Sequence, residues 1–427
     1  MKKFKVVRSV SLAIGLSTAV LSGNTMAQQQ AGATQPTGPV ICPGYVKGKS
    51  GLPGQRVGKK VQNAFEAYNE DDVAGAIDIL LDIEAKDSFD RAFVDNFIGK
   101  MMIGIDGRAA EAFTYLERAV KEKQLNDSDH ANTLKLLGQL GMQEKKYESA
   151  IGFFKKWMDF TCKEDAEVYT RIAQAHMELK QYAEMIEPAD KAIELYEEPN
   201  KNPYILKLSS YFERKMINEM VDIGEQLVVL FPENKQWWTQ LGSFYLQIED
   251  YDRALSVMDA AYLQGFLDKE SQIKLLAQLY AATGAPERAA RLKEKHLGEL
   301  LQRDADMLTS VAKSYHQARE FKTAAKYWGE AAKLSSDPKH FEEQGTLLLI
   351  AQDYRGAITA LGQALDRGAE DVGGIHYTLM EANFHSGNFK AAHVHAKEAR
   401  KDPSVRRNAN AWIPYIETKA KNRGISL

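Results

Sequence analysis

The sequence has little cysteine, little proline and no long apolar run beyond its first residues. Two cysteines in 427 residues exclude a disulfide-dense small protein and leave no Cys-x-x-Cys pair for a metal. Twelve prolines and 30 glycines without a three-residue period exclude collagen. A helix needs about 20 consecutive apolar residues to cross a bilayer. Because no later stretch reaches this length, we expect no direct membrane insertion.

An excess of basic residues is also missing, since the formal net charge is −3. Residues 1–27 contain four Lys or Arg and no acidic residue, so the chain without this segment carries −3 − 4 = −7. Nucleic-acid binding needs a basic surface that faces the phosphates. The charge therefore argues against a nucleic-acid partner.

Residues 1–27 have the pattern of a secretory signal peptide. A basic start precedes a short apolar run over residues 10–23, and small residues follow at Thr25 and Ala27. This pattern predicts cleavage after Ala27. An uncleaved anchor is the alternative, although the apolar run is short for a bilayer. We therefore expect the mature chain to be free in the bacterial periplasm.

Residues 28–57 form an arm rich in Gln, Gly and Pro, a composition that does not hold a packed core. Cys42 lies in this arm and Cys162 lies far along the chain. In an oxidising compartment the two cysteines can pair, which would tie the arm to the third of the repeats described next. Two unpaired thiols are the alternative, and the spacing does not decide between them.

From residue 58 onward one helical pattern recurs. In its clearest copy, apolar residues follow one face of a first helix and then one face of a second helix. Gly242 and Ala254 have almost no side chain where the two helices must cross, and larger residues surround that crossing. The residues of this copy are Trp238, Leu241, Gly242, Tyr245, Tyr251, Ala254, Met258 and Ala261.

This pattern resembles the tetratricopeptide repeat, whose period is about 34 residues. One marker position of the second helix recurs ten times, at intervals of 33 to 38 residues. The markers are Ala76, Ala112, Ala150, Met185, Met220, Ala254, Ala289, Ala324, Ala357 and Ala392. The resemblance implies an all-α, right-handed superhelical solenoid of about ten helix-turn-helix repeats over residues 58–403, one quasi-linear unit. A capping helix and tail are expected over residues 404–427.

Two details of the repeats depart from the family pattern. The first two repeats lack the Leu-Gly pair of the first helix. Pro188 falls within the second helix of the fourth repeat, where it should kink that helix or delay its start.

Catalytic spacing is absent from the sequence. There is no His-Glu-x-x-His, Gly-x-Ser-x-Gly or Gly-x-Gly-x-x-Gly pattern, so we expect no catalytic residue, no metal site, no cofactor and no enzymatic activity. Four of the nine histidines lie in the last repeat. Because His393 and His395 are two residues apart, they should point to different sides of a helix. Polar surface residues are the favoured interpretation, and a protonation-sensitive patch is the alternative.

In tetratricopeptide arrays the first helices line a concave groove that binds partners. By register, one polar row comprises Gln139, Gln174, Ser209, Ser243, Gln278, Lys313, Thr346 and Glu381. A largely apolar row one turn along comprises Met142, Met177, Phe212, Leu246, Ala281, His316, Leu349 and Phe384. Such a pair of rows suits an extended peptide. The alternative is that Met and Phe only cover the next repeat.

The groove that clamps chaperone tails in this family needs paired Lys and Asn residues. Lys135 and Gln139 come near this pattern, but the Asn is missing. We therefore do not expect that function.

A narrower resemblance concerns residues 57–68 (VGKKVQNAFEAY) and 72–80 (DVAGAIDIL), together with the signal and the Cys-Pro arm. This arrangement resembles tetratricopeptide proteins encoded alongside TonB energy-transducing systems in gammaproteobacteria. It implies a non-enzymatic periplasmic scaffold that binds envelope proteins, TonB-system components among them, as an accessory of TonB-dependent outer-membrane transport. The alternative is an assembly factor for exported polysaccharide, pili or outer-membrane proteins.

Overall fold

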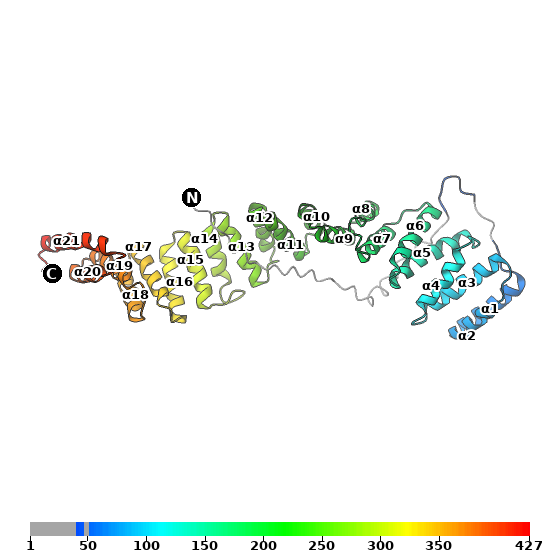
Figure 1. The fold of residues 1–427 in the computed structure, drawn as a ribbon, viewed down its shortest axis with the longest axis horizontal. Coiled ribbons are helices and arrows are strands. Elements are labelled where there is room, and N and C mark those ends of the chain that lie inside the picture. Colours follow the sequence, from blue (N-terminus) through cyan, green and yellow to red (C-terminus); the bar gives the residue numbers. More distant parts are fainter. Residues whose placement is uncertain (1–39, 47–50) are drawn as a thin grey trace. The chain divides into compact units, whose positions relative to one another are not determined.

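The computed structural model describes residues 40–46 and 51–427, and its regular structure in these ranges is entirely helical (Figure 1). The predicted signal peptide, its cleavage site and residues 28–39 and 47–50 of the arm lie outside the described residues. The chain divides into two compact units, residues 1–206 (unit 1) and 207–427 (unit 2). The boundary falls inside the helix of residues 201–213. The sequence had predicted one quasi-linear unit without such a division.

In its described residues, unit 1 contains eight complete helices and the start of a ninth. Their bounds are α1 (Gln55–Asn69), α2 (Val73–Leu81), α3 (Ser88–Ile103), α4 (Ala109–Val120), α5 (Asp127–Gln143), α6 (Tyr147–Thr161), α7 (Ala166–Glu178), α8 (Ile186–Leu195) and α9 (Lys201–Glu213). Consecutive helices pack in pairs, and each pair packs on the next. The first helix begins inside the segment predicted as arm.

Unit 2 continues the same alternation. Its helices after α9 are α10 (Ile217–Leu230), α11 (Lys235–Gln247), α12 (Tyr251–Leu263), α13 (Glu270–Ala282), α14 (Pro286–His296), α15 (Ala305–Gln317), α16 (Phe321–Leu334), α17 (Lys339–Ile350), α18 (Tyr354–Asp366), α19 (Val372–His385), α20 (Phe389–Ala399) and α21 (Arg406–Asn422). The helices α1 to α20 form ten successive pairs along the chain. The prediction of an all-α solenoid of about ten repeats is confirmed for the described residues.

Each of the ten turns within a pair contains one residue in the left-handed region of φ. An L-residue adopts this conformation at some cost, whereas glycine does so freely. The turn residues are Asp71, Gly107, Lys145, Lys180, Lys215, Glu249, Gly284, Arg319, Gln352 and Gly387. The turn reverses the chain within a few residues, so the second helix can pack against the first.

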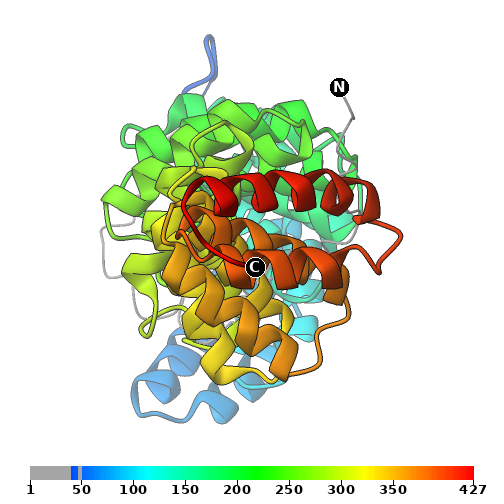
Figure 2. The same cartoon turned by 90° about the vertical axis from the view of Figure 1, so that its left-hand side faces the viewer.

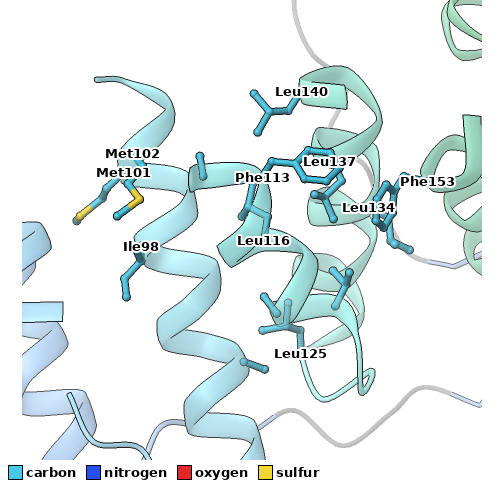
Figure 3. Close-up of a cluster of buried hydrophobic side chains, with 14 of the residues drawn as sticks. Ile98, Met101, Met102, Phe113, Leu116, Leu125, Leu134, Leu137, Leu140 and Phe153 are labelled. Atoms are coloured by element: carbon cyan, nitrogen blue, oxygen red, sulfur yellow. The ribbon is translucent and has the colours of Figure 1, made fainter. Parts of the chain in front are cut away.

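The predicted crossing positions are buried throughout. All ten marker residues have exposed fractions of 0–4%. Pro188 lies in the first turn of α8, which begins only at Ile186, so the prediction of a delayed start is confirmed. In unit 1 the buried residues of α3 to α6, among them Ile98, Leu116 and Leu137, form one cluster (Figure 3). In this part of unit 1 the core therefore lies between the paired helices.

A glycine of the first helix faces a large side chain of the second helix at four crossings. The pairs are Gly99 with Leu116, Gly138 with Phe154, Gly242 with Met258, and Gly345 with Leu361. Sequence reasoning missed the first of these pairs, because Ile98 precedes the glycine where a Leu was expected. Gly99 thus gives the second repeat the close crossing that its sequence had left uncertain.

The crossing at Gly138 leads to a prediction on packing. A Cβ on Gly138 would lie 2.5 Å from the ring of Phe154, which is 1% exposed. Gly138→Ala should therefore destabilise unit 1 by about 1–3 kcal/mol, the usual cost of overpacking. Gly152→Ala is the matched control, because a Cβ at this position of α6 meets nothing within 4 Å and alanine favours helix. Hydrogen exchange of unit 1 peptides measures both, and equal protection in the two variants would contradict the prediction.

Tyrosines of the first helices link neighbouring pairs in unit 2. Each hydroxyl donates a hydrogen bond to a carboxylate on the preceding second helix: Tyr245 to Glu225, Tyr280 to Asp259, and Tyr315 to Glu294. Burial, together with the bonded carboxylate, raises the pKa of Tyr245 and of Tyr280 to about 12. These links fix the register of one pair on the next, and therefore the spacing of residues along the first helices.

The C-terminal helix α21 matches the predicted capping helix in position. It packs on α20, as Figure 2 shows in red and orange. Ile416 is fully buried, while Trp412 Nε1 donates a hydrogen bond to the hydroxyl of Tyr377 at 3.0 Å. The helix thus covers the last repeat with an apolar face and leaves Lys419 and Lys421 exposed.

Candidate functional site

The predicted groove residues all lie on the first helices of the pairs. The helices that carry them are α5 and α7 in unit 1, and α9, α11, α13, α15, α17 and α19, with the α9 residues belonging to unit 2. Each helix carries one residue of the polar row and one residue of the apolar row, three positions apart. The two rows therefore recur once per repeat within each unit.

The polar row is accessible to different degrees. Gln139, Gln278 and Lys313 are exposed, and the other five members are half-buried. Ser243 and Thr346 donate their hydroxyl hydrogens to backbone oxygens of their own helices at 2.9 and 3.0 Å. Their oxygens can still accept a hydrogen bond from a partner. The row thus offers amide and ammonium donors beside hydroxyl acceptors.

Glu381 ends the polar row, on α19. Burial raises the pKa of this carboxyl, and a hydrogen bond from Tyr377 opposes the shift. The charge of His385 also opposes the shift. A half-buried carboxyl attracts a hydrogen-bond donor or a positive charge. Glu381 and the exposed Lys313 therefore give the row of unit 2 one group of each sign.

The apolar row splits between exposed and packed residues. Phe384 packs into the end of unit 2, with its ring centroid 5.4 Å from Phe389, 5.2 Å from Trp412 and 5.3 Å from Tyr415. At this position the alternative interpretation applies, because the ring covers the next element. His316 of α15 is exposed at the same register.

Other apolar positions are intermediate. Met142 packs against the large core cluster of unit 1, and Met177 packs beside Met185. Phe212, Leu246 and the other apolar-row members not yet described, Ala281 and Leu349, are half-buried. These side chains keep part of their surface available to a partner.

Lys135, which comes near the chaperone-clamp pattern, forms an ion pair within the chain. Lys135 Nζ lies 2.7 Å from Asp165 Oδ2 and over the ring of Trp157 at 4.7 Å from the centroid. Burial would raise the pKa of Asp165, but the hydrogen bond and charge of Lys135 outweigh it and hold that pKa below its usual value. Lys135 is thus committed to the contact between α5 and the start of α7.

The histidines of the last repeat point to different partners. His395 Nδ1 lies 3.0 Å from Nδ1 of His376, whereas His393 Nε2 lies 3.0 Å from Glu417 Oε1. The prediction that His393 and His395 face different sides is confirmed. Burial lowers the pKa of both His376 and His395. In the part of the chain that the structure describes, no group of three His, Cys, Asp or Glu residues could hold a metal ion.

Sequence reasoning missed a second feature, a cavity in unit 1 where the arm meets α4, α5 and α6. The cysteines were its only signal. In the structure Cys42 and Cys162 form a disulfide with an S–S distance of 2.11 Å. Ile41 N donates to Thr161 O at 2.9 Å, and the Tyr45 hydroxyl donates to Asp127 Oδ1 at 2.9 Å. We call residues 40–46 the docked arm.

The geometry defines a class of protein, a stack of paired helices in which each first helix repeats the same surface positions. Residues 166–199, which include α7 and α8, match the model of the tetratricopeptide repeat family. The match covers one helix pair, so tetratricopeptide repeat character is shown by the family model for this segment. None of the curated proteins compared with the chain matches it.

Several solved structures are similar to the chain at low identity. A tetratricopeptide repeat protein from Parabacteroides merdae is 15% identical, with 62% of this chain and 100% of that chain covered and a TM-score of 0.34. MamA from Desulfovibrio magneticus is 17% identical, with 42% and 98% covered and a TM-score of 0.33. The C-terminal part of a repeat protein from Cytophaga hutchinsonii is 14% identical, with 55% and 95% covered and a TM-score of 0.33. With TM-scores this low, these likenesses carry no inference about function.

No helix in the described ranges is both long and apolar enough to span a membrane.

Proposed function

We propose that this chain is a non-enzymatic scaffold that binds extended segments of other proteins along its first helices. One observation carries the proposal: each first helix from α5 to α19 presents a polar residue and, one turn along, a residue that is apolar in every helix except α15, where it is His316. A peptide in extended conformation offers backbone groups and alternate side chains, which match a polar row beside partly exposed apolar positions. Stacked helical repeats commonly bind through such an extended surface.

We further propose that the scaffold works in the bacterial periplasm. The signal pattern of residues 1–27 supports this location. The Cys42–Cys162 disulfide supports it as well, because structural disulfides persist in oxidising compartments and are rare in the cytosol. Fractionation of cells that express the untagged chain tests the location, and recovery in the cytosol with the first 27 residues attached would refute it.

The partner proposed for the scaffold is a component of a TonB-dependent outer-membrane transport system. Deletion of the gene should then slow growth on chelated iron or another large nutrient and leave surface polymers unchanged. The reverse outcome would favour an assembly factor for exported polysaccharide, pili or outer-membrane proteins. Complementation with the full chain controls for effects on neighbouring genes.

Site-specific photo-crosslinking tests the surface itself. A photoreactive residue at Gln278 or Lys313, both exposed on first helices, should capture a TonB-system component in living cells. Ser256, exposed on the second helix α12 of the same unit, is the matched control and should capture little. Equal capture from the three positions would refute the first-helix surface as the binding site.

A further inference from the structure

The cavity of unit 1 has the size of a small-molecule site. Its volume is about 830 Å³, within the range of about 300–1,000 Å³ that ligand pockets occupy. Three helices and the docked arm surround it. The residues that carry the argument are Tyr45 from the arm, Lys121 and Lys123 from the end of α4 and the turn after it, His130 and Leu134 from α5, and Phe160 from α6.

The lining combines apolar side chains with an excess of positive charge. Val120, Leu134, Phe153 and Phe160 supply the apolar part, and Figure 3 labels Leu134 and Phe153 in the buried cluster of unit 1. Two acidic residues stand against four cationic ones, a local charge of 4 − 2 = +2. The charged residues are Glu117, Asp159, Arg118, Lys121, Lys123 and Lys156.

Two of the lysines are available to a ligand. Arg118 already contacts Asp95 at 2.8 Å, and Lys156 lies over the Phe153 ring at 4.9 Å from its centroid. Lys121 and Lys123 form no ion pair with any described residue. Both lysines are exposed, so their ammonium groups are accessible to the charged end of an anion whose apolar part lies in the cavity.

A buried polar group adds an independent sign of a missing partner. His130 is 3% exposed, and its Nδ1 has no hydrogen-bond partner among the described residues. Its ring packs edge-on against Phe160, with the centroids 4.8 Å apart. Buried polar atoms in native proteins are nearly always paired, so such an orphan points to an unseen group.

The docked arm forms one wall of the same cavity. Cys42 and Tyr45 line it, and the disulfide joins the arm to the residue that follows α6. The Tyr45 ring also contacts Phe160, at 6.2 Å between centroids. The covalent bond therefore keeps an aromatic side chain in place at a site built mainly by helices.

We propose that the cavity binds a small amphipathic organic anion, with its apolar body against Leu134 and Phe160 and its carboxylate or sulfonate at Lys121 and Lys123. The Cys42–Cys162 disulfide holds the wall of this site in place. This site is separate from the residues proposed to bind a peptide, and neither proposal depends on the other.

The dye 8-anilinonaphthalene-1-sulfonate is a suitable probe, because it combines an aromatic body with one sulfonate. Its fluorescence titration against the full oxidised chain should show one saturable site. Lys121→Gln combined with Lys123→Gln should weaken the affinity about tenfold, since the anion loses both ammonium partners. Lys322→Gln combined with Lys326→Gln is the matched control, because these lysines line a second cavity of about 500 Å³ in unit 2. The control should leave the affinity unchanged.

Hydrogen exchange locates the bound dye. Protection on binding should appear in peptides covering residues 117–134 and 153–160. Protection elsewhere, or an affinity that the Lys121 and Lys123 variant leaves unchanged, would overturn the proposal.

A third variant tests whether the docked arm forms a wall of the binding site. Cys42→Ser combined with Cys162→Ser should weaken dye binding at least threefold, while its circular dichroism at the assay temperature stays that of the folded chain. Unchanged affinity in this folded variant would overturn the part assigned to the docked arm.

Discussion

Removal of the Cys42–Cys162 disulfide is expected to lower the free energy of unfolding of unit 1 by about 2–5 kcal/mol. The two cysteines are 120 residues apart, and the closed loop contains α1 to α6. A crosslink over so long a loop restricts the unfolded chain strongly, and the restriction grows slowly with loop length. The bond also holds the docked arm, whose other contacts are a few hydrogen bonds and ring contacts.

Hydrogen exchange followed by mass spectrometry measures this effect unit by unit. In the Cys42→Ser and Cys162→Ser double variant, peptides of α1 to α6 should exchange faster, and reductant should change the parent chain in the same way. Unit 2 contains no cysteine and serves as the internal control. Non-reducing mass analysis of the protein isolated from cells should find the bonded pair. Two free thiols there, or unchanged exchange in the double variant, would contradict the prediction.

Acidification should destabilise unit 1 through His130. Burial, with a smaller contribution from the charge of Lys123, lowers the pKa of this imidazole to about 4 from the usual 6.5, and the charge of Asp127 opposes the shift. Between these two pH values the unfolded chain binds a proton that the folded chain does not, so stability falls as the pH falls. A difference of about two and a half pKa units corresponds to about 3 kcal/mol, lost between pH 6.5 and pH 4 and constant below.

A variant without the titrating ring isolates this contribution. His130→Leu should remove about 3 kcal/mol of the difference in unfolding free energy of unit 1 between pH 7 and pH 4. His316→Leu, at an exposed position of unit 2, should leave the pH dependence of unit 1 unchanged. Parallel pH profiles of the parent and the His130 variant would show that the ring titrates normally in the folded chain.

Periodicity was sufficient to predict the helices and their order, because burial of one helical face leaves a direct record in the sequence. The ten marker positions from Ala76 to Ala392 are buried in the structure. Local sequence signals also predicted two further features. These are the late start of α8 near Pro188 and the terminal helix around Ile416. The role of Gly99 escaped prediction, because a small residue signals a crossing only once its opposing residue, Leu116, is known.

The sequence predicted which helix positions carry the candidate site, but it did not predict which of those side chains are exposed. Residues at one register of a repeat are equivalent in sequence, yet His316 is exposed while Phe384 packs against Trp412. The difference arises because α21 replaces a further repeat beside α19 and α20. Apart from the two cysteines, the cavity beside the docked arm had no signal in the sequence, because its lining comes from segments far apart in the chain.

The sequence by itself determined an all-helical repeat chain, because it has a period near 34 residues and is poor in proline and long apolar runs. It left open whether the two cysteines are bonded. Only the tertiary structure decided that Cys42 meets Cys162, that the chain divides within α9, and that His130 lies buried beside two unpaired lysines. Helix formation and the pairing of adjacent helices depend on neighbours within one repeat, which a periodic sequence records. The other features depend on contacts between segments separated by tens of residues or more, which no local pattern records.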